Sequence, residues 1–217
     1  MIYTIKPLRY VLVFTAIFMF LSAGFINAEY GIKGGVSYSK TKISGVDVDP
    51  FTGSYVKGFQ IGLYLDYRMD ENLSLQPGIY YVEKGLKQEW VYGDESSSQE
   101  LETKYLEFPL LMKYDINPGK SFNPYLIAGG YGAVLLNAKI KAAGDPDEDV
   151  KEFFKKMDYG LIGGIGVELA LGSMGNVILE ARYNMGLTDA HKILEDEANS
   201  DYTVKNRSFS FLVGFRF

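Results

Sequence analysis

The stretch that decides the fold is residues 205–217, KNRSFSFLVGFRF. Alternate residues of this stretch form an oily face that consists of Phe209, Phe211, Val213, Phe215 and Phe217. The residues between them are mostly small or polar, and a period of two predicts a β-strand. A strand with an oily outer face and edges that must find partners is typical of a membrane barrel. The rest of the chain is therefore expected to supply the other strands of that barrel.

Seven more segments have the length and pattern of strands: residues 30–38, 58–68, 73–84, 106–114, 124–138, 158–169 and 177–186. Six of them alternate between apolar and polar or small residues, whereas 124–138 is apolar on both faces and leaves its register open. Together with residues 205–217 they predict an all-β fold, an eight-stranded antiparallel up-and-down transmembrane β-barrel. Pro77 and Pro109 lie inside two of the strands, and bulges are expected there because proline donates no ladder hydrogen bond.

The connections between these strands alternate in length. Short connections are expected at residues 69–72, 115–123 and 171–176, and long ones at 40–57, 85–103, 139–156 and 189–204. An up-and-down outer-membrane barrel shows this pattern, with short turns on the periplasmic side and long loops outside the cell.

The first 28 residues have the pattern of a secretory signal. Lys6 and Arg9 precede an apolar run at 10–21, and Ala28 is the small residue expected at a cleavage site. The run is short for a membrane-spanning helix, although an uncleaved anchor is the alternative. The predicted organisation is a signal peptide at 1–28 and one barrel domain at 29–217.

Composition narrows the class further. The chain has 17 tyrosines, 14 phenylalanines and 24 glycines, a mixture that membrane strands and their aromatic girdles use. It has no cysteine, which excludes disulfides and thiolate chemistry. A formal charge of −5 without a basic stripe argues against a nucleic-acid partner.

The polar strand faces carry a nearly balanced set of charges. A soluble, lipocalin-like barrel would turn these charges to water, but the signal-like start and one-sided long loops favour the reverse orientation. Eight strands enclose only enough room for side chains, so the charges are expected to pair and to plug the lumen. The predicted lumen charge network comprises Lys33, Asp66, Arg68, Lys84, Glu107, Lys113, Asp158, Glu168, Glu180, Arg182 and Arg216.

Several blocks of the sequence resemble a known family. They include GIKGGVSYS at 31–39, NLSLQPGIYY at 72–81, YLEFPLLMKY at 105–114, YGLIGGIGVEL at 159–169 and FLVGFRF at 211–217. Together they are similar to the outer-membrane β-barrel domain, of PorT-like or porin-like type, of Bacteroidetes-type bacteria. The resemblance implies a location in the bacterial outer membrane, and it brings no motif of catalytic residues. It also implies that Phe215 and Phe217 belong to a signal that the barrel-assembly machinery reads during biogenesis.

Motifs for catalysis or cofactors are weak. The single histidine, His191, lies two residues after Asp189 in a predicted outer loop, and a catalytic triad would need a third convergent group. The acidic run at 145–149 does not fit an EF-hand, and Asp145 and Pro146 better suit the start of a short helix. We expect no catalytic residue, no metal site and no cofactor.

The outer loops are the expected place for contacts. Residues 85–103 hold the chain's one tryptophan, Trp90, near Tyr92, and they set Lys87 against five carboxylates. Aromatic side chains supply contact area and charge steers encounter. The sequence predicts a monomeric, non-enzymatic outer-membrane protein with a structural or surface-interaction role. Its outer wall is expected to contact membrane lipid, and Trp90 and Tyr92 are expected to be surface contacts for an unknown partner. A small transport or lipid-interacting barrel, a barrel enzyme and a soluble binder are the alternatives.

Overall fold

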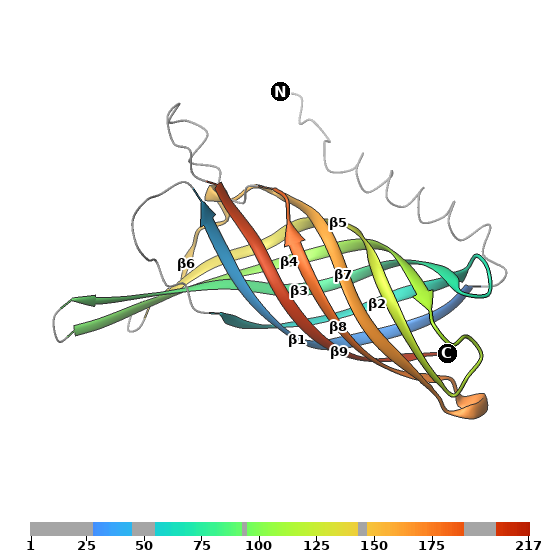
Figure 1. Ribbon diagram of the computed structural model, residues 1–217. Helices are drawn as coiled ribbons and strands as arrows, with labels where there is room; N and C mark the ends of the chain where they lie inside the picture. Colours follow the sequence, from blue (N-terminus) through green and yellow to red (C-terminus); the bar gives the residue numbers. More distant parts are fainter. Residues whose placement is uncertain (1–27, 45–54, 93–94, 143–146, 189–202) are drawn as a thin grey trace, which may run out of the picture.

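A computed structural model describes residues 28–44, 55–92, 95–142, 147–188 and 203–217. These residues form eight long strands: β1 (Ala28–Ser44), β2 (Val56–Arg68), β3 (Leu73–Tyr92), β4 (Glu95–Asp115), β5 (Phe122–Ala142), β7 (Met157–Ala170), β8 (Asn176–Gly186) and β9 (Thr203–Arg216). Each pairs antiparallel with the next, and β9 also pairs with β1, so the sheet closes on itself (Figure 1). The predicted eight-stranded antiparallel barrel is confirmed.

Alternation along each strand separates the outside of the barrel from its lumen. On β9, Phe211 and Val213 keep 51% and 60% of their surface exposed, while Leu212 between them keeps 2%. The exposed set on the other strands is equally apolar and includes Ile61, Leu63, Leu161 and Ile165. An apolar outer wall around a polar lumen suits lipid rather than water, so the soluble, lipocalin-like alternative is wrong. Within the described residues, no helix has the length and apolar character needed to cross a membrane.

The abundance of glycine and tyrosine has a structural reason inside the barrel. Tyr64 on β2 lies opposite Gly31 on β1, where a Cβ would come within 2.5 Å of the tyrosine hydroxyl oxygen. Tyr125 on β5 covers Gly166 on β7 in the same way, at 2.3 Å from its ring. Two more cross-strand pairs repeat the arrangement, Tyr80 with Gly62 and Tyr131 with Gly160. Glycine is therefore required where a lumen tyrosine lies flat on the neighbouring strand.

The strand at 122–142 acquires a definite register in the structure. Tyr125, Ile127 and Tyr131 are buried in the lumen, whereas Leu126 is 49% exposed on the outer wall. Its inward face packs with apolar side chains of neighbouring strands, including Leu111 and Ile162. One face of this strand is apolar because it lies on the outer wall, and the other because it packs against apolar side chains in the lumen. The sequence pattern alone therefore leaves its register open.

The bulges expected at the two prolines do not occur. At Pro77 the ladder between β3 and β4 lacks pairs but keeps its register, from Pro77 opposite Leu110 to Tyr80 opposite Glu107. Pro109 pairs in register with Tyr131 of β5. The barrel tolerates the missing donors without an inserted residue, and the one register shift between described strands lies at Lys104 and Tyr105, against β5.

The three short connections lie where the sequence predicts them, whereas two of the predicted long loops are wrong in whole or in part. Residues 85–103 are not a loop: β3 runs on to Tyr92 and β4 begins at Glu95, so they form a hairpin that projects past the barrel at the left of Figure 1. In 139–156, β5 continues to Ala142 and pairs with β6 (Glu148–Asp149). The expected short helix is reduced to a single 3₁₀ turn, η1 (Lys151–Phe153), while a second, η2 (Gly172–Met174), lies in the short β7–β8 turn. Asp145 and Pro146 lie outside the described residues.

Candidate functional site: the charged lumen

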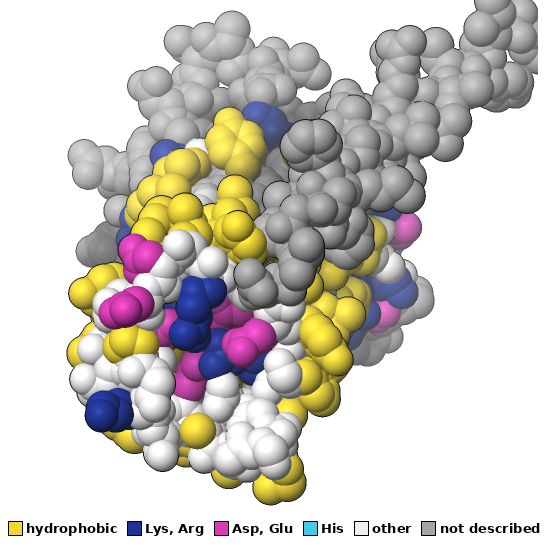
Figure 2. Space-filling view, turned by 90° about the vertical axis from the view of Figure 1, so that its right-hand side faces the viewer, with side chains coloured by type: hydrophobic (Ala, Val, Ile, Leu, Met, Phe, Trp, Pro, Cys, Tyr) yellow, Lys and Arg dark blue, Asp and Glu magenta, His cyan; other side chains and the backbone are white. Residues whose placement is uncertain are grey.

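Charged side chains fill the lumen from end to end. Of the eleven predicted lumen charges, ten are buried. The exception is Arg68, which ends β2 at the barrel mouth and is exposed there, so its assignment to the lumen is wrong. Figure 2 shows basic and acidic side chains gathered inside the short-turn opening, with hydrophobic side chains on its flanks.

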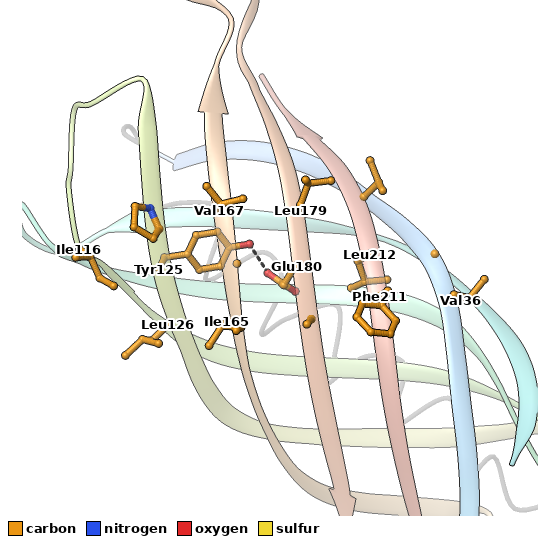
Figure 3. Close-up of a pocket in the computed structure, with 15 residues that line it drawn as sticks. Val36, Ile116, Tyr125, Leu126, Ile165, Val167, Leu179, Glu180, Phe211 and Leu212 are labelled. Atoms are coloured by element: carbon orange, nitrogen blue, oxygen red, sulfur yellow. Dashed lines mark hydrogen bonds between the residues drawn. The ribbon is translucent and has the colours of Figure 1, made fainter.

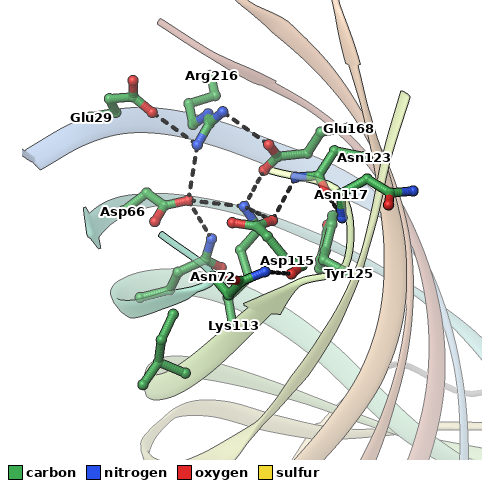
Figure 4. A network of polar contacts seen from close by, with 12 residues as sticks. Glu29, Asp66, Asn72, Lys113, Asp115, Asn117, Asn123, Tyr125, Glu168 and Arg216 are labelled. Atoms are coloured by element: carbon green, nitrogen blue, oxygen red, sulfur yellow. Dashed lines mark hydrogen bonds and ion pairs between the residues drawn. The ribbon is translucent and has the colours of Figure 1, made fainter. Parts of the chain in front are cut away.

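The lower cluster lies at the short-turn end and comprises Asp66, Lys113, Asp115, Glu168 and Arg216. Lys113 Nζ lies 2.8 Å from carboxylate oxygens of both Asp115 and Glu168, and 3.5 Å from Asp66. Arg216 contacts Glu168 at 2.9 Å and Asp66 at 3.3 Å (Figure 4). These pairs join β2, β4, β7 and β9 across the barrel, so they tie strands that are not neighbours in the sheet.

The rim of the lower cluster adds contacts that extend it to the short turns. Glu29 at the start of β1 reaches Arg216 at 2.8 Å, and its side chain is half exposed. Asn123 donates to Asp115 at 2.7 Å, and Asn72 of the β2–β3 turn donates to the Asp115 carbonyl oxygen at 2.8 Å. The mouth is therefore held shut by hydrogen bonds from the turns as well as by ion pairs.

The middle cluster is centred on Glu180 of β8. Lys33 of β1 donates to the Glu180 carboxylate at 2.7 Å, and the Tyr125 hydroxyl donates at 2.6 Å (Figure 3). Arg182 Nε donates to the other oxygen of Glu180. Neither Lys33 nor Glu180 has any exposed side-chain surface, and Arg182 keeps only 3%, so this carboxylate is the shared counter-ion of two cations that are shielded from bulk water. In the same close-up, Leu179 belongs to the lining of a pocket on the outer wall.

Tyrosine rings complete the middle cluster. Lys33 Nζ lies 4.2 Å from the centre of the Tyr64 ring, and the guanidinium of Arg182 lies 4.9 Å from the centre of the Tyr80 ring. A desolvated cation is attracted to the face of an aromatic ring. The rings thus both stabilise the two cations and fill the space that a channel would need.

The upper cluster lies toward the projecting hairpin. Lys84 of β3 contacts Glu107 at 3.3 Å and Asp158 at 3.4 Å. Tyr131 donates to Asp158 at 3.2 Å, and Asn184 donates to Glu107 at 3.4 Å. Every buried lysine, arginine, aspartate and glutamate in the described part of the barrel thus has an opposite charge within 4 Å, which leaves these groups engaged with each other.

Reasoning from the sequence missed several residues of this network. Asp115 was placed in a short connection, although it ends β4 and faces the lumen. With Asp115 included and Arg68 removed, the lumen holds five buried cations and six buried carboxylates. Gln76 also belongs here, since its amide donates to Asp66 at 2.9 Å. Its position on the polar face of the predicted strand at 73–84 was the available signal.

The remaining predicted sites lie outside the lumen. Trp90 and Tyr92 are strand residues near the tip of the projecting hairpin, opposite Ser97 and Glu95 in the register. Phe215 and Phe217 lie at the short-turn end, where the Phe217 ring stacks on Tyr30 with centroids 5.3 Å apart. His191 and Asp189, and residues 1–27 of the predicted signal, lie outside the described residues. Where the chain is described, no group of histidine, aspartate and glutamate is suited to hold a metal ion.

A filled lumen predicts the absence of a channel. Purified protein in a planar bilayer is expected to show no stable ohmic conductance, because eight strands leave no continuous water path beside the paired side chains. A porin of sixteen strands measured in the same bilayers is the positive control. Reproducible single-channel steps that scale with salt concentration would contradict this prediction.

Comparisons with known proteins agree with this architecture. The family model of the outer membrane protein β-barrel domain matches residues 19–192. The solved structure of the outer membrane protein OprG from Pseudomonas aeruginosa superposes with a TM-score of 0.50 at 14% identity, covering 88% of this chain and 96% of that one. Neisserial surface protein A gives 0.47 at 18% identity over 88% and 99%, and the outer membrane enzyme PagL gives 0.41 at 14% identity over 86% and 97%. Among curated proteins, none matches this sequence significantly.

The family match covers most of the chain, and the superposition on OprG supports the same fold. The PorT-like subtype and the signal peptide stay predictions. An apolar outer wall, a closed ring of eight strands and a family model that spans most of the sequence lead to one identification: the chain belongs to the outer membrane protein β-barrel domain family, and it resides in the bacterial outer membrane.

Proposed function

We propose that this barrel is non-enzymatic, that its lumen serves only to hold the fold together, and that it contacts a partner through its outer end. One observation carries the proposal: the buried charges of the lumen are engaged with one another, from Asp66 at the lower end to Lys84 at the upper end. Groups that are already paired are poorly suited to bind a passing solute or to act on a substrate. The part of the described chain that extends beyond the barrel is then the best place for an interaction.

The projecting hairpin, residues 85–103, has the features of a contact element. Its strands pair from Gly85 opposite Glu102 to Tyr92 opposite Glu95. On one side β4 also pairs with β5, up to Gln99 opposite Ala142, whereas β3 pairs with β2 only as far as Val82. Beyond that point the Glu83 carbonyl oxygen accepts a hydrogen bond from the Ser37 hydroxyl, and the Gly85 backbone is bonded to the Ser39 hydroxyl. Past Gly85, no described strand pairs with the outer edge of β3, and an extended partner segment could add there as a further strand.

The composition of the hairpin favours a cationic or carbohydrate partner. The hairpin contains one positively charged residue, Lys87, and five negatively charged residues, which gives a net charge of −4. The five are Glu89, Asp94, Glu95, Glu100 and Glu102. Trp90 and Tyr92 occupy the same hairpin. Carboxylates would steer a cationic partner, and aromatic rings supply contact area at modest entropic cost.

Replacement of residues 86–102 by a short Gly/Ser turn tests the proposal. Crosslinking on intact cells followed by affinity capture is expected to recover the same partner with the unaltered protein and to lose it with the replacement. The unboiled protein should keep its shifted migration on a gel, because the lumen clusters lie below the hairpin. Tyr55→Ala, at an exposed position on the same end, is the matched control and should leave capture unchanged. Undiminished recovery with the hairpin replaced would overturn its role as the contact element.

A further inference from the structure

A group of basic residues lies on the outer wall at the long-loop end of the barrel. We name it the outer basic patch and define it as Lys57 of β2 with Lys205 and Arg207 of β9. Arg207 pairs with Lys40 and Lys205 with Lys42, while Tyr38 of β1 pairs with Lys57 on its other side. The three strands are direct neighbours, and the ends of β1 and β9 lie side by side in Figure 1.

The patch belongs to the face that meets lipid. Lys205 and Arg207 continue the alternate positions of Phe209 and Phe211, which are exposed on the outer wall. Lys57 in the same way continues the outward positions of Phe59 and Ile61. Successive outward positions of one strand share a face, so these cations stand on the wall itself and not in the lumen.

The position along the barrel axis puts the patch at the level of lipid headgroups. On β9 the apolar outer row runs from Phe217 to Phe209, which is nine residues and eight steps, and at about 3.3 Å a step and a tilt of about 40° it spans roughly 20 Å along the axis. Tyr38 and Phe209 mark the upper border of this row and lie opposite each other. Arg207 follows directly beyond that border, on the side where the long connections lie and which faces outward from the cell.

The described chain supplies no counter-ion for the patch. No carboxylate among the described residues lies within ion-pair distance of Lys57, Lys205 or Arg207, and the buried Nε of Arg207 has no hydrogen-bond partner there. Like charges gathered on one face repel, so such a group is stabilised when an anion bridges it. Other outward lysines at the long-loop end of the barrel do have carboxylate counter-ions.

Three such lysines provide the contrast. Lys104 contacts Glu102 at 2.9 Å and Glu83 at 3.7 Å, Lys139 contacts Asp147 at 3.5 Å, and Lys141 also contacts Glu102. Hydrogen bonds from Lys141 and Lys104 hold the pKa of Glu102 below its usual range, so these pairs stay charged and neutralise each other. Among the described side chains at this end, the positive charge without a counter-ion is therefore concentrated on β2 and β9.

We propose that the outer basic patch binds the phosphate groups of a phosphorylated lipid headgroup in the outer leaflet of the membrane. The patch directly follows the apolar row, so a single lipid molecule can pack its acyl chains against Phe209 and Phe211 while its phosphate contacts Arg207. A soluble phosphate would gain nothing from that row. Arginine and lysine both donate several hydrogen bonds to phosphate oxygens, and Arg207 can do so in a bidentate manner.

The test compares two matched triple variants of the full chain in nanodiscs. The first carries Lys57→Gln, Lys205→Gln and Arg207→Gln, and the control carries Lys104→Gln, Lys139→Gln and Lys141→Gln, so both lose three positive charges at the same end. The probe is diphosphoryl lipid A in a phosphatidylcholine background, with its dephosphorylated form for comparison, and bound lipid is counted by native mass spectrometry. If each cation strengthens lipid binding as much as a cation beside a membrane usually does, removing one lowers the affinity about fivefold and removing three lowers it about a hundredfold.

The proposal expects that the patch variant loses about a hundredfold in affinity for the phosphorylated lipid, while the control loses less than about fivefold. It also expects that the dephosphorylated lipid binds both proteins weakly and that inorganic phosphate at equal concentration does not compete. Equal losses in both variants, or unchanged binding by the patch variant, would overturn it, and so would competition by inorganic phosphate, which would assign the site to soluble anions. If the triple variant loses its heat-shifted migration, the single variants Arg207→Gln and Lys104→Gln replace the pair, with an expected loss of about fivefold for Arg207→Gln and an unchanged affinity for Lys104→Gln, and equal losses would overturn the proposal.

Discussion

Replacement of Glu180 by glutamine is expected to destabilise the folded barrel by about 3–5 kcal/mol, because it removes one partner of a buried ion pair and leaves the other charge uncompensated. Glu180 is in contact with both Lys33 and Arg182, and it accepts the hydroxyl hydrogen bond of Tyr125. Glutamine keeps the size of the side chain and removes only the charge. The two cations would then share the middle cluster without a carboxylate in contact, in a site that excludes bulk water.

The matched control is Glu102→Gln, the same chemical change on the outer wall. Glu102 also contacts two cations, Lys104 and Lys141, but their side chains are 34% and 47% exposed. Exposed pairs contribute about 0–1 kcal/mol, so the control is expected to lie within that range. Urea unfolding of both variants in detergent micelles, followed by loss of the shifted gel band, gives the two free energies. A difference below about 1 kcal/mol between the variants would contradict a dry middle cluster.

A third variant separates charge from packing. Replacement of Lys33, Glu180 and Arg182 together by Met, Leu and Met removes the charges of the middle cluster while it keeps most of the volume. Apolar replacement of a complete buried ion group is often neutral or stabilising, so stability should recover much of what Glu180→Gln loses. Recovery would show that the uncompensated charges, and not a cavity, account for the loss.

Most of the fold could be predicted from the alternation of apolar with polar or small residues along the strands. A single-residue slip would exchange the two faces of a strand, so a clear alternation such as that around Phe211 and Leu212 fixes which side meets lipid. It does so without reference to the other strands. The same alternation placed Glu180 and Arg182 on the polar face, where the structure buries both.

Positions near strand ends and partners across the lumen were beyond the reach of that pattern. Arg68 has the parity of a lumen residue but lies where the wall ends, and Asp115 lies inside although it borders a turn. Which charges meet depends on how far each strand is staggered against its neighbour, which closure of the whole barrel sets. The contact between Arg216 and Asp66 joins residues 150 positions apart, and no local pattern encodes it.

The projecting hairpin could not be predicted from the sequence, for a different reason. The segment around Ser96 and Ser97 is polar and lacks the alternation of a membrane strand, so it has the composition of a loop. Above the membrane, however, a strand has no lipid-facing side and needs no apolar alternation. Its backbone hydrogen bonds to β3, and in part to β5, are enough to extend the sheet.

Deletion of residues 215–217 is expected to lower the amount of inserted barrel by more than tenfold, because it removes the lower seam of the ring and one of its two lower cations. Phe215 pairs with Ile32, and the Phe217 amide donates to the Tyr30 carbonyl oxygen at 2.9 Å. Each loss of about 1.4 kcal/mol at the seam lowers the ratio of folded to unfolded barrel tenfold, and a chain that does not close its ring is not recovered as inserted barrel. The measurement is the amount of heat-shifted protein in the outer-membrane fraction of cells.

The single variant Phe217→Ala distinguishes an assembly signal from a stabilising contact, since it keeps Arg216 and its ion pairs with Glu168 and Asp66. If the assembly machinery reads this aromatic ring, as the resemblance to outer-membrane barrels implies, the variant should refold in detergent as the unaltered protein does and yet accumulate several-fold less in cells. Phe209→Ala, at the opposite border of the same outward row, serves as the control and should accumulate normally. Normal cellular levels of Phe217→Ala would contradict a role in recognition, and an equal defect in detergent would assign the ring to stability, through its stacking on Tyr30.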